Sequence, residues 1–275
     1  MAEEIAPTLV STGSAAGLHR IEPANLVRIL AKEVKYEVLK TLRSPMYLVA
    51  TVVFPVMFYI LFGLAMGRQM IGSVSNTMYL IPAYGTFGVM GASLFGTAAS
   101  LASERGLGWL EVKRASPMPP FAYFFAKIVM SLMFSTADVL LLLFLGAAFG
   151  GVRLPLMIAM KLLATLVAGA LPFCSMGLAI GYFAGPTSAP AVINLFHLPM
   201  SFASGLWMPI MFLPRLVREI AVFLPPYHLS QLALSLVGAG RGEPDLDHWK
   251  ALVGFAMICL GIAWWGFKRD EQANA

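Results

Sequence analysis

Few residues of this chain could do chemistry, and Asp138 is the most unusual of them. It stands inside a long apolar stretch, and an ionised carboxylate at the centre of a bilayer costs at least about 2.5 kcal/mol. The carboxyl group could contact a substrate or a cation. It could equally be a protonated or hydrogen-bonded group that ties helices together, through Ser135 or a threonine of another helix. The sequence supports the two interpretations equally.

A second set of polar residues follows helical spacing. Asn194, His197, Ser201 and Ser204 are separated by three, four and three residues, so a helix would carry them on one face. Such a stripe could line a translocation path or face a partner subunit. Hydrogen bonding between helices is the commoner role of serine and asparagine within a membrane.

Metal binding and catalysis find no support in the sequence. Neither His-Glu-x-x-His nor the phosphate-binding Gly-x-x-x-x-Gly-Lys-Ser/Thr occurs. The histidines and cysteines form no recognisable motif: His19, His197, His228, His248, Cys174 and Cys259. We therefore expect no catalytic residue, no metal and no cofactor in this chain.

Long hydrophobic stretches indicate which helices hold these residues in place. Between Lys161 and Arg215 lie 53 residues without Asp, Glu, Lys or Arg. The 60 residues between Arg43 and Glu104 contain one charge, Arg68. Each stretch can hold two spanning helices of about 20 residues. With 59% hydrophobic and 12% charged residues, the chain is expected to be an all-α polytopic membrane protein. The net charge of +5 favours anchoring at the cytoplasmic face of a membrane over nucleic-acid binding.

We expect six transmembrane helices within a single transmembrane domain over residues 23–275. Residues 1–22 contain no apolar core of a signal peptide and are expected to form a flexible tail. Apolar residues at steps of three and four predict an N-terminal amphipathic interfacial helix over 23–43. Lys and Arg near the ends of the spans place both termini in the cytoplasm. The spans are expected near 46–66, 79–101, 124–149, 156–183, 189–211 and 249–267.

The segment 213–238 is too apolar for an ordinary loop. Two short apolar runs flank Pro225-Pro226, and the prolines should end the first of them. Each run is about half as long as a crossing requires. We therefore predict a re-entrant outer hairpin before the last span, with a soluble cap as the alternative.

Glycines and lysines within the spans suggest packing roles. Gly177, Gly181 and Gly185 repeat at every fourth position, which predicts a surface for close helix approach. Lys127 and Lys161 lie near the ends of the third and fourth spans, and we expect both to extend toward the headgroups.

The loop after the second span contains the most informative polar segment. It reads ASERGLGWLEVKRASPMPP over residues 102–120. A helix capped by Ser103 or Glu104 and ended by Pro117 would lie crosswise between two spans and display both charge signs. A solvated loop with an incidental ion pair is the plainer alternative.

This segment resembles the type-2 permeases of ATP-binding-cassette (ABC) exporters, which typically show Glu-Arg-Glu-x-Gly-Thr-Leu-Glu, a basic residue or two, and Ala/Ser/Thr-Pro. Gly106 stands where Glu is usual and Trp109 where Thr is usual. The amphipathic helix, the six spans and the hairpin agree with the same family. The matching residues are Glu104, Arg105, Gly108, Leu110, Glu111, Arg114, Ser116 and Pro117.

The resemblance implies a drug- or antibiotic-exporter-like transport subunit of a bacterial inner membrane. Two permeases, identical or sister chains, would enclose a path for a hydrophobic or amphipathic cargo such as a drug, antibiotic, peptide or lipid-like molecule. Two separate ATPase subunits would bind ATP and Mg. They would receive the helix over 104–117, including Trp109. The alternatives are an ATP-independent secondary transporter or channel that uses Asp138, and a lipid-modifying enzyme, for which the sequence offers no convincing residues.

Overall fold

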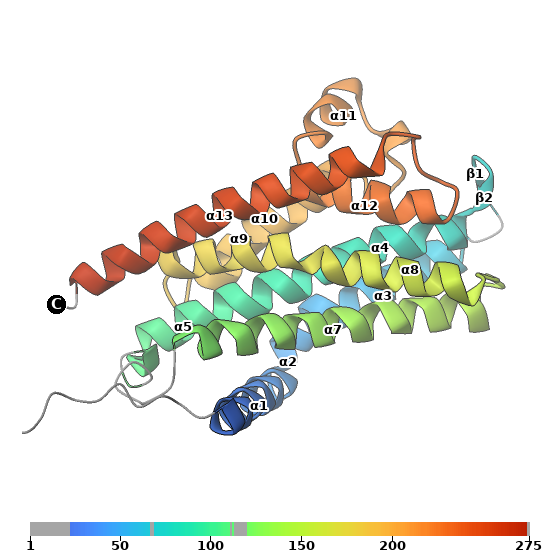
Figure 1. Cartoon of the computed structure of the whole chain (residues 1–275). Coiled ribbons are helices and arrows are strands. Elements are labelled where there is room, and N and C mark those ends of the chain that lie inside the picture. Colours follow the sequence, from blue (N-terminus) through green and yellow to red (C-terminus); the bar gives the residue numbers. More distant parts are fainter. Residues whose placement is uncertain (1–22, 67–68, 111, 113–119, 274–275) are drawn as a thin grey trace, which may run out of the picture.

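The computed structural model describes residues 23–66, 69–110, 112 and 120–273, and most of them are helical (Figure 1). Among these residues, five helical runs are long and apolar enough to cross a membrane. They are Pro45–Leu64, Asn76–Gly106, Phe121–Ala148, Leu156–Phe183 and Asp245–Gln272. The chain therefore has the polytopic helical architecture that its composition predicts.

The first two runs contain π-helical segments. The first consists of α2 (Pro45–Leu48), Val49–Val53, α3 (Phe54–Phe58) and Tyr59–Leu64. A two-stranded hairpin follows, formed by β1 (Met70–Ile71) and β2 (Val74–Ser75). The second run consists of α4 (Asn76–Leu94), Phe95–Ala99 and α5 (Ser100–Gly106).

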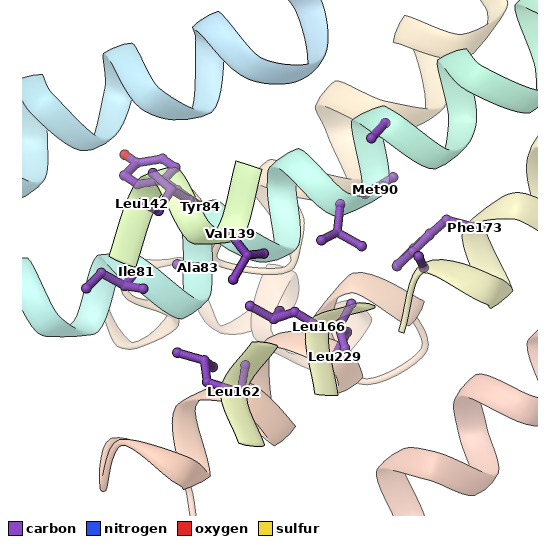
Figure 2. Close-up of a cluster of buried hydrophobic side chains, with 14 of the residues drawn as sticks. Ile81, Ala83, Tyr84, Met90, Val139, Leu142, Leu162, Leu166, Phe173 and Leu229 are labelled. Atoms are coloured by element: carbon purple, nitrogen blue, oxygen red, sulfur yellow. The ribbon is translucent and has the colours of Figure 1, made fainter. Parts of the chain in front are cut away.

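The remaining long helices complete the bundle around α4. They are α7 (Pro120–Ala148), the pair α8 (Leu156–Ala168) and α9 (Ala170–Phe183), and α13 (Asp245–Ala273). In Asn76–Gly106, 94% of the most apolar 18-residue stretch is buried inside the protein. The corresponding share is 22–39% in the other four runs. Figure 2 shows why: Val139 and Leu142 of α7, Leu162 and Leu166 of α8, and Phe173 of α9 gather near Ile81, Tyr84 and Met90 of α4. The helix α4 is thus the centre of the core.

The predicted fifth span over 189–211 is shorter than expected. Its helix, α10 (Ala189–Ala203), has 15 residues, or about 22 Å at 1.5 Å per residue. The hydrocarbon core of a bilayer is about 30 Å thick. Gly205, at φ +76°, ends the helix: its N–H bonds the Phe202 carbonyl, and the Leu206 N–H bonds the Ser201 carbonyl. This is the Schellman geometry that glycine favours. A crossing by this segment therefore stays a prediction.

The two halves of the predicted hairpin differ in their surroundings. After a short turn at Ile210–Phe212, α11 (Arg215–Ala221) stands off one side of the bundle, beside α12 and the start of α13 (Figure 1). In contrast, α12 (Pro225–Leu236) is largely buried against α4, α8 and α13. The expectation that Pro225 and Pro226 end the preceding helix is wrong. That helix ends at Ala221, and the two prolines begin α12. In the first turn of a helix their missing N–H groups cost nothing.

The amphipathic helix predicted over 23–43 is α1 (Pro23–Leu42). It lies across the bundle (Figure 1) and packs on α7. Glu37 and Thr41 are buried on the side facing the bundle. The inner face of α1 is thus partly polar, and its carboxylate needs a partner inside the protein.

Candidate functional site

A cluster of charged side chains joins α1, α5 and α7, and we call it the charge junction: Glu37, Lys40, Ser100, Glu104 and Lys127. The Lys127 ammonium nitrogen lies 2.8 Å from Glu37 Oε1 and 3.3 Å from Glu104 Oε1. Lys40 also contacts both carboxylates. Ser100 donates a 2.7 Å hydrogen bond to Glu37. Residues up to 90 positions apart therefore meet at one point.

The charge junction is electrically balanced, with two ammonium groups and two carboxylates. Lys127 has 0% of its surface exposed, and its ammonium group also lies 4.5 Å from the Tyr123 ring centre. Burial opposes ionisation of Glu37, but the nearby Lys127 and Lys40 outweigh it and hold the pKa of Glu37 below its ordinary value. Removing one member of such a group leaves an uncompensated buried charge.

The expectation that Lys127 extends toward the headgroups is therefore wrong. Lys127 lies two turns into α7, on the side that faces α1 and α5. Two carboxylates are within reach there, so the ammonium group is satisfied inside the protein. The sequence analysis also did not identify Glu37 as a partner of Lys127, although the sequence contains an indication that such a pair exists. A lysine deep in an apolar stretch predicts a nearby acidic partner.

The predicted crosswise helix does not begin at Ser103 or Glu104. The helix of the second span continues through both residues and ends at Gly106. Gly108 then adopts φ +74°, a left-handed conformation that glycine tolerates best. A helical hydrogen bond from the Val112 N–H to the Gly108 carbonyl follows. The predicted residues Glu111 and Arg114, and the end of the segment at Pro117, lie outside the described residues.

The departure from the family pattern at Gly106 has a steric reason. A Cβ atom there would lie 2.0 Å from Cγ of Pro186, in the turn between α9 and α10. The glutamate that is usual at this position would collide with that turn. A glycine therefore allows the end of α5 to approach the end of α9.

Arg105 holds the same two helix ends together. Its Nη1 donates to the carbonyl oxygens of Gly181, at 3.0 Å, and of Tyr182. These carbonyls belong to the last turn of α9, which has no further helical N–H to bind them. The Arg105 Nε also lies 3.6 Å from Asp270 Oδ1 of α13. Glu104 and Arg105, which the sequence assigned to ATPase coupling, thus use their charges inside this chain.

Within the described part of the predicted coupling segment, residues 104–117, the exposed side chains are apolar. Leu107 is 68% exposed and Trp109 is 56% exposed, whereas Leu110 is buried against Leu101 and Tyr123. A groove of about 340 Å³ runs between this turn and α1, with Tyr36 of α1 on its other side. An apolar surface therefore borders the charge junction.

A separate cavity of about 600 Å³ opens between the first span, α4 and α10. None of its lining residues is charged. The aromatic and polar residues that line it are Phe54, Phe58, Phe87, Phe95, Trp207, Asn194 and His197. Cavities of this size with apolar walls and a few polar groups are typical of small-molecule sites.

The polar groups of this cavity come from two neighbouring segments. The His197 ring stacks on Phe87 at 4.5 Å, and its Nε2 lies 3.2 Å from the Phe87 carbonyl oxygen. Within the described residues, neither the Asn194 amide nor the Trp207 Nε1–H has a hydrogen-bond partner. Both groups could therefore bind a polar atom of a ligand.

The four residues of the predicted polar stripe on α10 and just after it do not share one environment. Ser201 is buried, does not line the cavity and donates its hydroxyl hydrogen to the His197 carbonyl of its own helix. Ser204 is buried as well. Asn194 and His197 alone of the four residues border the cavity.

Asp138 lies between α7 and α4, against Gly88, and lines neither the aromatic cavity nor the groove beside α1. It is fully buried, and neither carboxyl oxygen has a hydrogen-bond partner there. The Ser135 hydroxyl also lacks one, so the suggested tie through Ser135 is not made. A Cβ atom on Gly88 would lie 1.8 Å from Asp138 Oδ2, so this glycine makes room for the carboxyl group.

Only part of the predicted glycine surface is used. A Cβ atom on Gly177 would lie 1.9 Å from Thr97 Oγ1, and one on Gly181 would lie 3.0 Å from Leu101. Gly185 follows the end of α9 and approaches nothing closer than Ser188, at 3.4 Å. The close contact therefore lies between α9 and the Phe95–Gly106 part of the second span.

Among the described residues, no three His, Cys, Asp or Glu side chains gather as a metal site requires.

Comparisons with known proteins agree with these features. The family model described as "ABC-2 type transporter" matches residues 32–237. A relative from Bacillus subtilis (strain 168), described as "Putative transport permease YvfS", is 23% identical over 247 residues, which is 90% of this chain and the whole length of the relative. The matched region includes the charge junction, the coupling segment and the cavity. The resemblance noted in the sequence is thereby confirmed, and the chain belongs to the ABC-2 type transporter family.

Proposed function

We propose that this chain is the membrane subunit of an ATP-driven exporter for uncharged hydrophobic or amphipathic molecules. Members of the ABC-2 permease family work with ABC ATPase subunits and dimerise. The ATP and Mg would be bound by the partner ATPase. The charge junction beside an exposed apolar turn is the observation that carries the proposal.

The groove between α1 and the turn at Leu107–Trp109 is the proposed ATPase-docking surface. Tryptophan and tyrosine are enriched among the residues that dominate binding interfaces, and Trp109 and Tyr36 both line this groove. Leu107 and Trp109 are exposed, although Glu104 and Leu110, one to three residues away, are buried. This supports a role in contact with another protein.

Movement at this surface would be passed on through the charge junction. Glu104 connects the end of the second span to Lys40 of α1 and to Lys127 of α7. Arg105 connects it to α9 and α13. Separating buried ions is costly, so these elements would move together when the ATPase subunits close.

The aromatic cavity supports the proposed class of cargo. Its uncharged walls would disfavour an ionic molecule, and aromatic rings pack well against flat apolar groups. The Asn194 amide and the Trp207 N–H would orient a cargo with hydrogen-bonding atoms. The cargo expected from these walls is a planar, uncharged molecule with a polar edge.

Co-purification tests the docking surface. The wild-type chain, isolated from its own membrane, should carry an ATP-binding protein with ATPase activity at a fixed ratio. Trp109→Glu should lose that protein, because the charge would have to be buried in an apolar contact. Phe223→Glu is the matched control, since Phe223 is also exposed, at 84%, but follows α11, which lies toward the other end of the molecule from α5 (Figure 1). Glu104→Lys is unsuitable, because Glu104 is buried.

Two results would contradict the proposal. One is a Trp109→Glu variant that retains the ATP-binding protein as well as Phe223→Glu does. The other is purified chain that moves cargo across a vesicle membrane without nucleotide, which would favour the ATP-independent alternative.

A further inference from the structure

A second polar cluster lies toward the other end of the bundle from the charge junction, where α12 meets the start of α13 (Figure 1). His228 of α12 and His248 of the first turn of α13 meet there, with 2.9 Å between their Nδ1 atoms. The two rings lie 5.2 Å apart between centres. His248 is buried and His228 is partly buried. The sequence showed two isolated histidines, and the fold turns them into a pair.

The outer nitrogens of both rings face groups that only accept hydrogen bonds. His228 Nε2 lies 2.9 Å from the carbonyl oxygen of Val222, just after α11. His248 Nε2 lies 3.4 Å from Glu243 Oε2. Carbonyl and carboxylate oxygens are acceptors, so each Nε2 is best satisfied when it carries a hydrogen.

A neutral imidazole has only one N–H. If both rings were neutral with hydrogen on Nε2, two lone pairs would face each other at 2.9 Å. That separation is a hydrogen-bond distance, and it requires a hydrogen between the two Nδ1 atoms. One additional proton, shared by the pair, satisfies all four nitrogens.

Among the charged and titratable groups around the pair, the Glu243 carboxylate is the one that favours a positive charge on it. Glu243 faces His248 and accepts a 2.9 Å hydrogen bond from the Tyr227 hydroxyl. Arg241 donates in turn to that hydroxyl oxygen, at 3.3 Å. Burial, with help from Glu243, raises the pKa of Tyr227 to about 12, so Tyr227 stays protonated near neutral pH. Burial and the neighbouring His248 lower the pKa of His228, which makes His228 the accepting ring.

Other acidic groups of this region are bound elsewhere. Asp245 accepts a hydrogen bond from Ser235, and Asp247 pairs with Lys250. Glu219 of α11 pairs with Arg215 of the same helix. The carboxylate that faces the histidine pair is therefore Glu243.

We propose that His228 and His248 form a proton-binding site that fastens α11 and α12 to the first turn of α13. The bound proton closes the Nδ1–Nδ1 contact, and its loss opens that contact. Because His228 also holds the end of α11 through Val222, one proton fixes three elements. The chain runs from α10 through Trp207, which lines the aromatic cavity, to α11. Binding or loss of the proton would therefore affect the segment that borders this cavity. This proposal is independent of the proposed ATPase docking.

The sign of the pH dependence follows from this geometry. The fastened state holds a proton that the open state does not need, so acid stabilises the fastened state. The stabilisation is full below the range in which histidines titrate, roughly pH 5 to 8, and is lost as the pH rises through it. Loss of a charged hydrogen bond of this kind corresponds to about a tenfold change in an opening equilibrium.

Hydrogen exchange on the purified full chain in lipid nanodiscs tests the site. Protection factors, which are corrected for the intrinsic exchange rate at each pH, should fall about tenfold over 222–238 between pH 5.5 and pH 8. Amides over 178–184, near Arg105, should keep theirs and serve as the internal reference. His248→Asn should remove the pH dependence, because the neutral asparagine amide can donate to His228 at every pH. His228→Asn should remove it too, and His19→Asn should leave it intact.

Several outcomes would overturn the proposal. One is equal protection of 222–238 at both pH values in the wild type. Another is a pH dependence that persists in His248→Asn and His228→Asn. A third is protection at pH 8 that rises with added ZnCl2 and falls with EDTA, because the pair would then bind a metal ion and not a proton.

Discussion

At the residue scale, each buried charge of this protein can be judged by its partners. Lys127 has two carboxylates within 3.3 Å, whereas Asp138 has no hydrogen-bond partner among the described residues. A paired buried ion is stable only while its partners remain. An unpaired buried carboxyl group is better accommodated without charge. The two residues therefore call for different tests.

Lys127→Met should destabilise the protein strongly, because Glu37 and Glu104 would then face a single ammonium group. Breaking a buried pair typically costs about 3–5 kcal/mol. Thermal unfolding of the detergent-solubilised chain should shift downward by several degrees. Lys161→Met, at an exposed lysine of α8, is the control and should change little. Adding Glu37→Gln to Lys127→Met restores charge balance and should recover part of the loss. An unchanged unfolding temperature in Lys127→Met would show that the charge junction does not hold the three helices.

Asp138→Asn should leave ATP-dependent transport largely intact if the chain is the exporter subunit proposed here. Asparagine has the size of aspartate, so the space beside Gly88 stays filled. Cargo uptake into inverted vesicles with ATP measures the effect, and Asp138→Glu, which is too large for that space, should be less stable. A complete loss of transport in well-folded Asp138→Asn would instead favour the ion-coupled alternative.

At the scale of the helices, close approach between α9 and the second span brings the polar segments together. Gly177 and Gly181 remove side chains from this contact, and Arg105 closes its end by binding the last carbonyls of α9. The contact places the turn at Leu107–Trp109 beside α1. Small residues thus position the coupling segment although they take no part in its chemistry.

Gly177→Leu should therefore disturb both stability and coupling. Its side chain would meet Thr97 and the Leu94 carbonyl, and such overpacking costs about 1–3 kcal/mol. Gly185→Ala is the matched control, because its Cβ has ordinary space beside Ser188. Unfolding temperature and ATPase co-purification should both fall in the first variant and not in the second. Equal behaviour of the two variants would mean that α9 can move away without consequence.

At the scale of the whole molecule, two polar clusters lie at opposite ends of the bundle with the aromatic cavity between the first span and α10. The helix α13, about 43 Å long at 1.5 Å per residue, reaches from His248 at one end to Asp270 beside Arg105 at the other. The central helix α4 borders the cavity through Phe87. The proposed ATPase docking and the proposed proton site would therefore control the two ends of this transport subunit separately.

Asn194→Asp should reduce export of an uncharged aromatic cargo by at least about tenfold, because it places an ionised group in an uncharged cavity. Asn194→Gln keeps the amide and should retain most of the activity. Neither variant should alter co-purification of the ATPase, since Asn194 does not line the groove beside Leu107 and Trp109. Cargo-stimulated ATP hydrolysis in nanodiscs measures the difference. If the aspartate variant handles neutral cargo normally, the cavity is not part of the path.

Local patterns in the sequence determined much of this molecule. Long uncharged stretches predict the spanning helices, steps of three and four predict α1, and the Glu104–Glu111 motif indicates the family. These features depend on residues close together in the chain, and hydrophobic periodicity reports on such residues directly. Only the tertiary structure decided that Glu104 lies in the last turn of the second span, that Lys127 meets Glu37 and that His228 meets His248. Those contacts join residues 20 to 90 positions apart, and helix packing selects them from many sterically possible pairs. A periodic pattern shows which face of a helix is apolar, but it does not identify the polar partner opposite that face.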